Sequence, residues 1–354
     1  MSRSPEKPLR RGWTTGACAT AATSAALQAL WGEGFPERVT ITLPRGETPT
    51  FDIAGHDRGP GWAEAGVIKD AGDDPDVTHG ALIRVRAEPA ARGAGVVFRA
   101  GTGVGTVTRP GLPLPVGEPA INPVPRRMMA AEATALARRY RRAADAVLTV
   151  SIPGGEGLAA RTWNPRLGIE GGLSILGTTG IVRPFSCAAW IASIHRGIDV
   201  ARASGLTHVA GCTGAMSEAA VQRLHRLPDH ALLDMGDFAG GLLKYLARHP
   251  LPRLTIGGGI GKLAKLAQGA GDLHSARSRL DFAALNRLAR RAGLADVSGA
   301  HTALEALQIA GPGLAQAVAE AALEQVRARL PGAAIAADVV VVDRQGAILG
   351  RAGP

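Results

Sequence analysis

The sequence predicts a chain of two domains, a strand-rich α+β domain followed by a wound, mainly parallel α/β domain. The chain has 354 residues, which is more than one ordinary hydrophobic core holds. Its first half carries several short apolar runs of strand length and few helical stretches. Its second half repeats a strand, a glycine turn and a helix three times, the pattern of a parallel sheet covered by helices. We expect the domains to span residues 1–196 and 197–354.

In the first half, local signals place each element. Thr14-Thr15-Gly16 precedes an Ala-rich stretch to about Leu30, and threonine hydroxyls suit the free amides of a first helical turn. Residues 39–43 alternate as a half-buried strand, and Pro44-Arg45-Gly46 turns the chain towards a partner strand near residues 50–53. Further strands are expected at 65–68, 81–87, 95–99 and 146–152, with a helix at 126–143.

In the second half, three units follow one another. The predicted strands are residues 207–210, 231–234 and 254–256, and the helices that follow the first two end near residues 224 and 248. Helices near 282–292, 299–309 and 313–329 precede a last strand at 338–343. Parallel strands wound in this way form a Rossmann-like domain.

The glycine turns of these units should lie together, because the carboxyl ends of parallel strands share one edge of the sheet, where helix N-termini offer free amides. Asp234 follows the first turn by about 20 residues, the place where an acidic residue typically binds ribose hydroxyls. This indicates a nucleoside-bearing cofactor, although none of the turns forms G-x-G-x-x-G or a P-loop, and ordinary helix-entry glycines remain the alternative. The candidate cofactor-binding residues are Gly211, Gly214, Asp234, Gly257, Gly259 and Gly261.

The segment 69–80 is the most unusual part of the first half. It carries Asp70, Asp73, Asp74 and Asp76 between Lys69 and His79. Its glycine and proline exclude a regular helix or a central strand, so it should be a loop that joins two strands. Carboxylates this close repel one another unless cations, amides or a ligand compensate them. The loop is therefore either a solvated turn or part of a functional site.

Two further loops could present polar groups at fixed angles. One runs from residue 101 to 127 and carries Arg109, Asn122 and Arg126, and its three prolines between residues 119 and 125 should hold the backbone extended. The other spans residues 164–184 and ends near Arg183. There apolar residues alternate with small ones, as where backbone packs against a flat ligand. Braced surface loops are the alternative for both.

The amino-acid composition favours some classes of binding partner over others. The net charge is +10, and only five of the 40 basic residues are lysines, which favours an anionic partner. The arginines are spread along the chain and aromatic residues are few (5 Trp, 2 Tyr, 6 Phe), so nucleic-acid binding is not indicated. No apolar run approaches the ~18 residues of a membrane span. The three cysteines have no metal or disulfide spacing and fit a reduced cytoplasmic setting.

Taken together, these stretches resemble the CbiD family, the cobalt-precorrin-5B C1-methyltransferases of cobalamin biosynthesis. The resemblance implies S-adenosylmethionine as methyl donor and a cobalt-bearing polycarboxylate tetrapyrrole as acceptor. We expect the cobalt to belong to the substrate and no metal to be bound by the protein itself, and contacts with neighbouring pathway enzymes would be transient. It is dense over residues 10–186 and thins afterwards. The matching stretches are residues 11–16, 69–80, 103–112, 117–125, 151–156 and 164–184, with weaker matches at 261–262 and 274–275.

This resemblance and the residues together give a working hypothesis. Methyl transfer from a sulfonium to an electron-rich ring carbon requires alignment and exclusion of water rather than a nucleophilic side chain. The alternative is an NAD(P)-linked oxidoreductase that acts on an anionic metabolite through the same glycine turns. We expect the acceptor's carboxylates to bind Lys69, Arg109, Asn122, Arg126 and Arg183 on the first domain. Asp70, Asp73 and Asp74 would lie beside the sulfonium or take the proton lost from the macrocycle.

Overall fold

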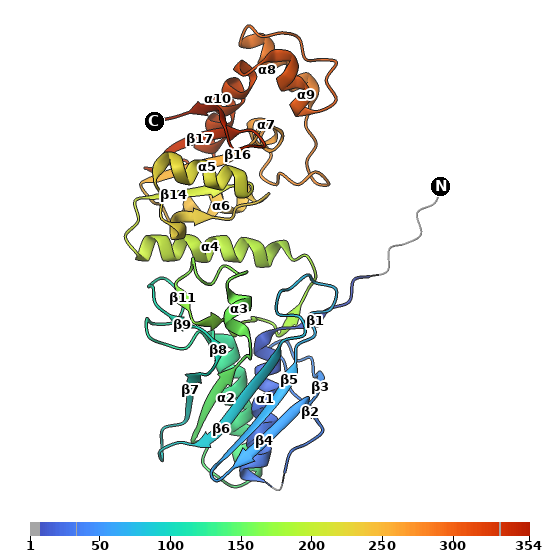
Figure 1. Cartoon of the computed structure of the whole chain (residues 1–354), viewed down its shortest axis with the longest axis vertical. Helices are drawn as coiled ribbons and strands as arrows, with labels where there is room; N and C mark the ends of the chain where they lie inside the picture. The colour runs from blue at the N-terminus through green and yellow to red at the C-terminus, as the bar shows by residue number, and fades with distance from the viewer. Residues whose placement is uncertain (1–7, 33, 333) are drawn as a thin grey trace, which may run out of the picture. The chain divides into compact units, whose positions relative to one another are not determined.

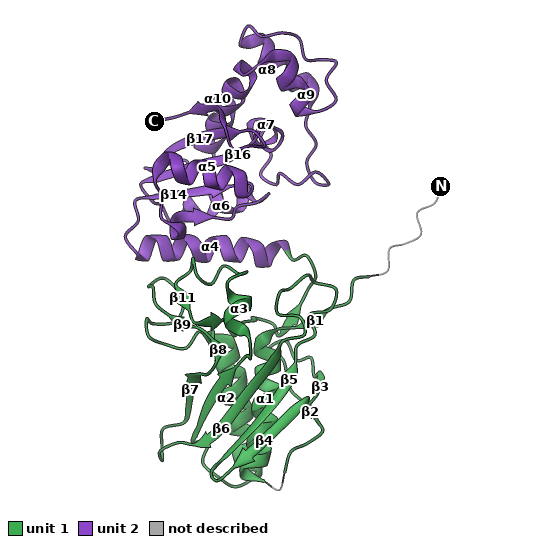
Figure 2. Cartoon of the chain, viewed as in Figure 1, with its two compact units in different colours: residues 1–186 green, residues 187–354 purple. Residues whose placement is uncertain are grey.

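The structure is a computed structural model that describes residues 8–32, 34–332 and 334–354. It divides into two compact units, Met1–Ser186 and Cys187–Pro354 (Figures 1 and 2). The boundary expected near residue 197 falls inside helix α4 (Cys187–Ala203), whose Ile194 and Ile198 belong to the core of unit 2. The mixed α and β content that the sequence predicts is confirmed.

Unit 1 is built on a five-stranded sheet with two helices on one face (Figure 1). Its strand order is β4 (Gly55–Gly59), β5 (Trp62–Ile68), β6 (Leu82–Pro89), β10 (Ala146–Ser151) and β7 (Val96–Ala100). All neighbours are antiparallel except β10 and β7. Alternate residues such as Val67 and Val85 are buried on the helix side, while Glu64 and Arg84 pair at 3.1 Å on the other. The loop 69–80 joins β5 to β6, as predicted.

The two helices on this sheet show why their ends were predicted unequally well. Helix α1 (Thr15–Trp31) begins where expected, because the Thr14 hydroxyl accepts a hydrogen bond from Ala17 N at 3.2 Å. Helix α2 (Pro123–Arg139) corrects the expectation of an extended backbone, since Pro123 and Pro125 lie in its first turn. First-turn amides have no intrahelical acceptor, so proline costs little there.

Several short ladders complete unit 1. Strands β2 (Arg38–Thr40) and β3 (Thr50–Asp52) form the predicted hairpin. The other ladders join loops that are distant in the sequence, and helix α3 (Gly155–Ala159) packs beside them. They are β1 (Gly12–Trp13) with β13 (Ile181–Val182), β8 (Gly103–Val104) with β12 (Gly172–Leu173), and β9 (Thr106–Val107) with β11 (Ile169–Glu170).

Unit 2 contains a second five-stranded sheet, in the order β15 (Leu232–Leu233), β14 (His208–Cys212), β16 (Arg253–Gly259), β17 (Ala336–Val342) and β18 (Ile348–Ala352). The first four strands are parallel and β18 is antiparallel. The chain adds β15 on one side of β14 and then β16 on the other. The strand order therefore reverses at β14, and the turns after β14 and β16 diverge at this point.

Helices cover both faces of this sheet (Figure 1). Val340 and Val342 of β17 pack with helix α5 (Ala215–His225), whereas Val339 and Val341 face the larger core on the other side. None of the helices in the described part of the chain has the length and hydropathy that a membrane crossing requires. The larger core contains α4, α6 (Ala239–Leu246), α7 (Ile260–Ala267), α8 (Phe282–Arg291), α9 (Ala303–Ala310) and α10 (Gly313–Ala328).

Candidate functional site

Three stretches that are far apart in the sequence meet at the N-terminal end of α1. Gly72 has φ +68°, and a Cβ there would lie 2.2 Å from the backbone oxygen of Arg10, so only glycine fits this crossing. Residues 10–16, 69–80 and 174–184 therefore form one assembly of loops, which we call the α1 loop cluster. The backbone hydrogen bonds that join it are Trp13 N to Asp70 O (2.7 Å), Thr14 N to Gly180 O (3.0 Å) and Gly16 N to Leu176 O (2.9 Å).

Within this cluster, Arg10 binds two of the predicted aspartates. Its guanidinium forms a bidentate ion pair with Asp70, in which Nη2 lies 2.9 Å from Oδ1. Its backbone N donates to Asp73 Oδ2 at 2.6 Å. The hydrogen bond from Arg10 lowers the pKa of Asp70 to about 2. Asp70 is therefore ionised at neutral pH, and the Asp73 side chain remains exposed.

The other two aspartates are also engaged. Phe185 N donates to Asp74 Oδ1 at 2.8 Å and so ties the loop to the end of unit 1. Lys69 is 1% exposed, and its Nζ lies 2.7 Å from Asp76 Oδ2, while Thr78 donates twice to Asp76 Oδ1. Burial would raise the pKa of Asp76, but the bonds from Lys69 and Thr78 outweigh it and lower the pKa. Lys69 thus holds the loop from inside.

The polar residues expected to bind the acceptor fall into two groups. Arg126 donates to the oxygens of Ile121, Glu118 and Pro119 at 2.8–3.0 Å, and Arg109 donates to the backbone oxygens of Pro165 and Arg166 at 3.4 Å. These two arginines brace their own loops.

Asn122 and Arg183 form the second group. The Asn122 amide does not cap α2 and has no side-chain hydrogen bond within the described residues, and exposed Arg183 likewise has no ion pair there. These two side chains are available to a ligand.

Apolar side chains are exposed on these segments and at the residues directly next to them. Phe185 is 66% exposed, Ile68 56% and Leu176 49%. Phe185 also has φ +54°, which is rare for a bulky residue and marks a strained backbone. Sequence reasoning missed these residues, although single large apolar residues in otherwise small or polar loops were the available signal. The α1 loop cluster therefore combines apolar surface with cationic groups.

In unit 2, three of the predicted glycines lie where the turns open. Gly214 precedes α5 and Gly259 precedes α7, and neither helix has a side-chain cap. Apart from its chain neighbours, no described residue lies within 4 Å of a Cβ built on Gly214, and a Cβ on Gly261 in the first turn of α7 meets Ala303 at an ordinary 3.8 Å. The amides at the start of both helices are therefore available for a ligand.

The other predicted residues of this edge have partners in the unit. Gly211 and Gly257 lie inside β14 and β16, where an added Cβ would come within 2.6 Å of Leu242 and 2.8 Å of Val221. These glycines make room for core side chains. Asp234 is partly buried, and its backbone oxygen accepts from Trp190 Nε1 at 2.9 Å.

A lysine and an aspartate that sequence reasoning did not select also lie at this edge. Lys262 Nζ donates to the backbone oxygen of Thr213 at 3.0 Å and lies 3.0 Å from Asp237 Oδ1. Asp237 follows β15, Thr213 follows β14, and Lys262 is in the first turn of α7. The available signal was their place directly after the strands in successive units.

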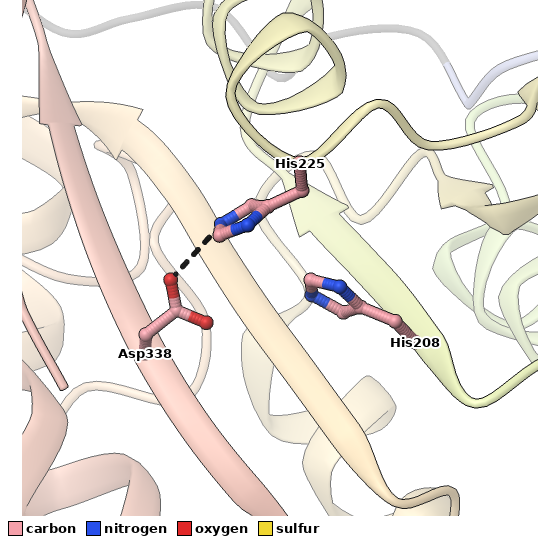
Figure 3. A group of neighbouring side chains, drawn as sticks. All are labelled: His208, His225 and Asp338. Atoms are coloured by element: carbon pink, nitrogen blue, oxygen red, sulfur yellow. Dashed lines mark hydrogen bonds and ion pairs between the residues drawn. The ribbon is translucent and has the colours of Figure 1, made fainter. Parts of the chain in front are cut away.

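A separate polar cluster lies towards the opposite edge of the sheet (Figure 3). His225 Nε2 lies 3.2 Å from Asp338 Oδ2, and His208 reaches the same carboxylate through Thr255, by contacts of 2.8 and 2.7 Å. Burial lowers the pKa of His208 to about 4 and also lowers that of His225, so both are neutral at pH 7.

The donor atoms of His208, His225 and Asp338 lie within 4.8 Å of one another, and this group of the described residues could hold a metal ion. However, Arg253 and Arg351 approach the buried Asp338 carboxylate at 3.5 and 3.7 Å, and their charge opposes a bound cation. The expectation of no protein-bound metal stays a prediction.

Comparisons with known proteins agree with one another. The family model CbiD matches residues 2–184, and the model "CbiD, C-terminal domain" matches residues 272–353. A protein of Paramagnetospirillum magneticum named cobalt-precorrin-5B C(1)-methyltransferase is 59% identical over 353 residues, which cover 98% of this chain and 99% of that protein. A protein of the same name from Brucella anthropi is 58% identical, and the match covers 99% of this chain and 98% of that protein.

Among solved structures, the crystal structure of the cobalamin biosynthesis protein (cbiD) from Archaeoglobus fulgidus is 27% identical. The match covers 76% of this chain and 83% of the chain in that crystal structure, with a TM-score of 0.42.

Proposed function

The chain belongs to the CbiD family, and we propose that it transfers a methyl group from S-adenosylmethionine to C-1 of cobalt-precorrin-5B, giving cobalt-precorrin-6A. The observation that carries this proposal is the 59% identity, over 98% of the chain, to a relative named for that reaction. The alternative of an NAD(P)-linked oxidoreductase finds no support in the relatives compared.

We place the acceptor at the α1 loop cluster. The acceptor is a flat, largely apolar macrocycle that carries carboxylates, so its site needs apolar surface beside cations and amides. Leu176 and Phe185 supply exposed apolar side chains, and Arg183 supplies a guanidinium that has no ion pair with any described residue. Asn122 adds an amide. Lys69, Arg109 and Arg126 act indirectly, because their contacts hold the loops that present these groups.

The aspartates of the loop divide by their surroundings. A carboxylate whose pKa is about 2 is a weak base at neutral pH, so Asp70 suits the fixing of Arg10 better than proton abstraction. Within the described residues, the carboxylates of Asp73 and Asp74 each accept one hydrogen bond, from a backbone amide. We keep these two as the candidates that face the sulfonium or take the proton lost from the macrocycle.

We interpret unit 2 as a Rossmann-like domain that binds the donor at the carboxyl edge of its sheet. Four parallel strands whose order reverses at β14 support this interpretation, because ligands of open α/β sheets bind where the strand order reverses. The amides next to Gly214, Gly259 and Gly261 are the open ones, and Asp234 follows β15, where ribose hydroxyls are commonly bound. Gly211 and Gly257 contribute by packing.

The chemistry requires little from individual side chains. The ring carbon attacks the methyl carbon, the carbon–sulfur bond breaks, and the sulfonium leaves as the neutral thioether S-adenosylhomocysteine, while the macrocycle releases a proton. Alignment of two bound substrates is worth up to ~7–11 kcal/mol in well-oriented reactions. Exclusion of water prevents competing reactions of the donor. A rigid loop cluster and an open sheet edge are consistent with such a reaction.

The test is incubation with S-adenosylmethionine labelled with ¹³C in its methyl group and with cobalt-precorrin-5B. We expect one new labelled methyl carbon, located at C-1 by NMR. A parallel reaction with the metal-free macrocycle determines whether cobalt is required. Label at another ring position, or consumption of NADPH without label transfer, would contradict the proposal.

A further inference from the structure

The Lys262–Asp237 ion pair lies where three loops of unit 2 converge. Backbone hydrogen bonds lock these loops together, from Thr213 N to Gly257 O at 2.9 Å and from Gly236 N to Cys212 O at 3.0 Å. The pair is partly buried, with 21% of the Asp237 side chain and 40% of the Lys262 side chain exposed. It therefore stands on rigid turns at the carboxyl ends of β14, β15 and β16.

The pair is incompletely satisfied by the protein. Asp237 Oδ1 is buried and has no hydrogen bond of good geometry, although Lys262 Nζ lies 3.0 Å away. Lys262 bonds to one backbone oxygen, that of Thr213, and an ammonium can donate three hydrogen bonds. The nearby Lys262 ammonium compensates the charge of this oxygen, so both groups keep hydrogen-bonding capacity for a ligand although neither charge is unpaired.

The surroundings favour a ligand with both charges. Helices α5 and α7 start beside the pair without side-chain caps, and their N-termini favour a carboxylate near Lys262. Asp237 offers the complementary site for an ammonium. An amino acid carries an α-carboxylate and an α-ammonium on one carbon, so its two charges match this arrangement. The amino-acid end of S-adenosylmethionine has this chemistry.

We propose that Asp237 and Lys262 bind the zwitterionic amino-acid end of the methyl donor, Lys262 its carboxylate and Asp237 its ammonium. This inference rests on the proposed function, because it takes S-adenosylmethionine as the donor. In the free protein the two side chains pair with each other. Binding replaces that one ion pair by two with the ligand, in which the ligand's ammonium donates to the buried oxygen of Asp237. The donor is then anchored at the end opposite to its adenosine.

The test is calorimetric titration of the full chain with three probes. S-Adenosylhomocysteine carries the whole zwitterion, 5′-(3-aminopropyl)thioadenosine lacks the carboxylate, and 5′-methylthioadenosine lacks both charges. For the natural sequence we expect loss of the carboxylate to weaken binding at least tenfold. Lys262→Gln keeps a donor for the Thr213 oxygen but removes the charge. This variant should bind S-adenosylhomocysteine at least tenfold more weakly than the natural chain. Its affinity for 5′-methylthioadenosine should change by less than twofold.

Asp237→Asn should likewise weaken both amino-bearing probes and spare 5′-methylthioadenosine. Lys244→Met, on the exposed side of α6, is the matched control and should bind all three probes like the natural chain. Unchanged affinity of Lys262→Gln for S-adenosylhomocysteine would overturn the inference, even if the ¹³C assay gives C-1 methylation. Failure of the natural chain to bind S-adenosylhomocysteine, together with no label transfer, would instead remove the proposed function.

Discussion

The buried pair of Lys69 and Asp76 gives the sharpest prediction for unit 1. Lys69 is 1% exposed, and its ammonium lies 2.7 Å from a carboxylate oxygen of Asp76. Lys69→Met keeps a flexible chain of similar length but removes the charge. Asp76 is then left ionised and partly buried, with only the two hydrogen bonds from Thr78. We expect unit 1 to be clearly destabilised.

The magnitude follows from two opposing effects. At an effective dielectric constant of about 20, two charges 2.7 Å apart attract by roughly 6 kcal/mol, and desolvation removes much of this. Removal of one partner from a fully buried pair typically costs about 3–5 kcal/mol. Because the Asp76 side chain is 25% exposed, water solvates the remaining charge in part. We therefore expect a loss of about 2–3 kcal/mol in the free energy of unfolding.

Urea unfolding followed by tryptophan fluorescence measures this loss, because four of the five tryptophans lie in unit 1. With a slope of about 2 kcal/mol per molar urea, the midpoint should fall by about 1–1.5 M. Lys244→Met, an exposed lysine of unit 2, should leave it unchanged. The double variant Lys69→Met/Asp76→Asn should be less destabilised than the sum of the single variants. If the urea midpoint of Lys69→Met lies within 0.2 M of that of the natural chain (about the precision of the measurement), the reasoning is refuted.

Three further predictions concern pH, turnover and metal. The folded state lowers the pKa of His208 to about 4, from about 6.5 in the unfolded chain. Neutral His208 therefore adds to the free energy of unfolding above pH 6.5, and this stabilisation is lost as the pH falls towards 4. Because His208 is only half buried, this loss should be about 1–2 kcal/mol, and thermal melts of His208→Gln should show a flatter dependence between pH 7 and 4.5. Asp73→Asn and Asp74→Asn should each lower the rate of label transfer at least tenfold while S-adenosylhomocysteine binds as before, and natural turnover in both would exclude a catalytic role. Mass spectrometry of the purified chain should find well below one metal per chain, and a chelator should leave the melting temperature unchanged, whereas a stoichiometric metal lost in His225→Ala would show that the cluster in Figure 3 is occupied.

The elements that were predicted well carry their signal locally. The cap at Thr14, the alternation of the β2–β3 hairpin and the apolar run of β17 are each decided within a few residues. The α2 prediction was wrong at its start because proline suits an extended chain and a first helical turn equally. The ladders β1–β13 and β8–β12 were missed because two-residue strands have no periodicity and their partners are distant in the sequence.

The candidate site shows the same limit for charges. The density of carboxylates in residues 69–80 identified the loop from sequence alone. What balances those charges could not be found in this way, because Arg10 binds Asp70 from 60 residues away and Phe185 binds Asp74 from 111. Lys69 was expected to help bind the acceptor's carboxylates, but its side chain is buried against Asp76. Its burial depends on the packing of α1 against β5 and β6, which no local pattern encodes.

The glycines in the strand-to-helix turns of unit 2 serve two different purposes, which the structure separates. Gly211 and Gly214 flank the end of β14, yet a Cβ on the first would meet core side chains and a Cβ on the second would meet nothing within 4 Å. A similar difference separates Gly257 from Gly259 at the end of β16, where a Cβ on Gly257 would lie 2.8 Å from Val221 and one on Gly259 would meet Val342 O at an ordinary 3.9 Å. In both turns the glycine on the strand side makes room for packing, and the glycine on the helix side leaves amides open. A ligand at this edge should therefore contact the helix-side glycines and the charged residues next to them, and substitutions on the strand side should act through stability.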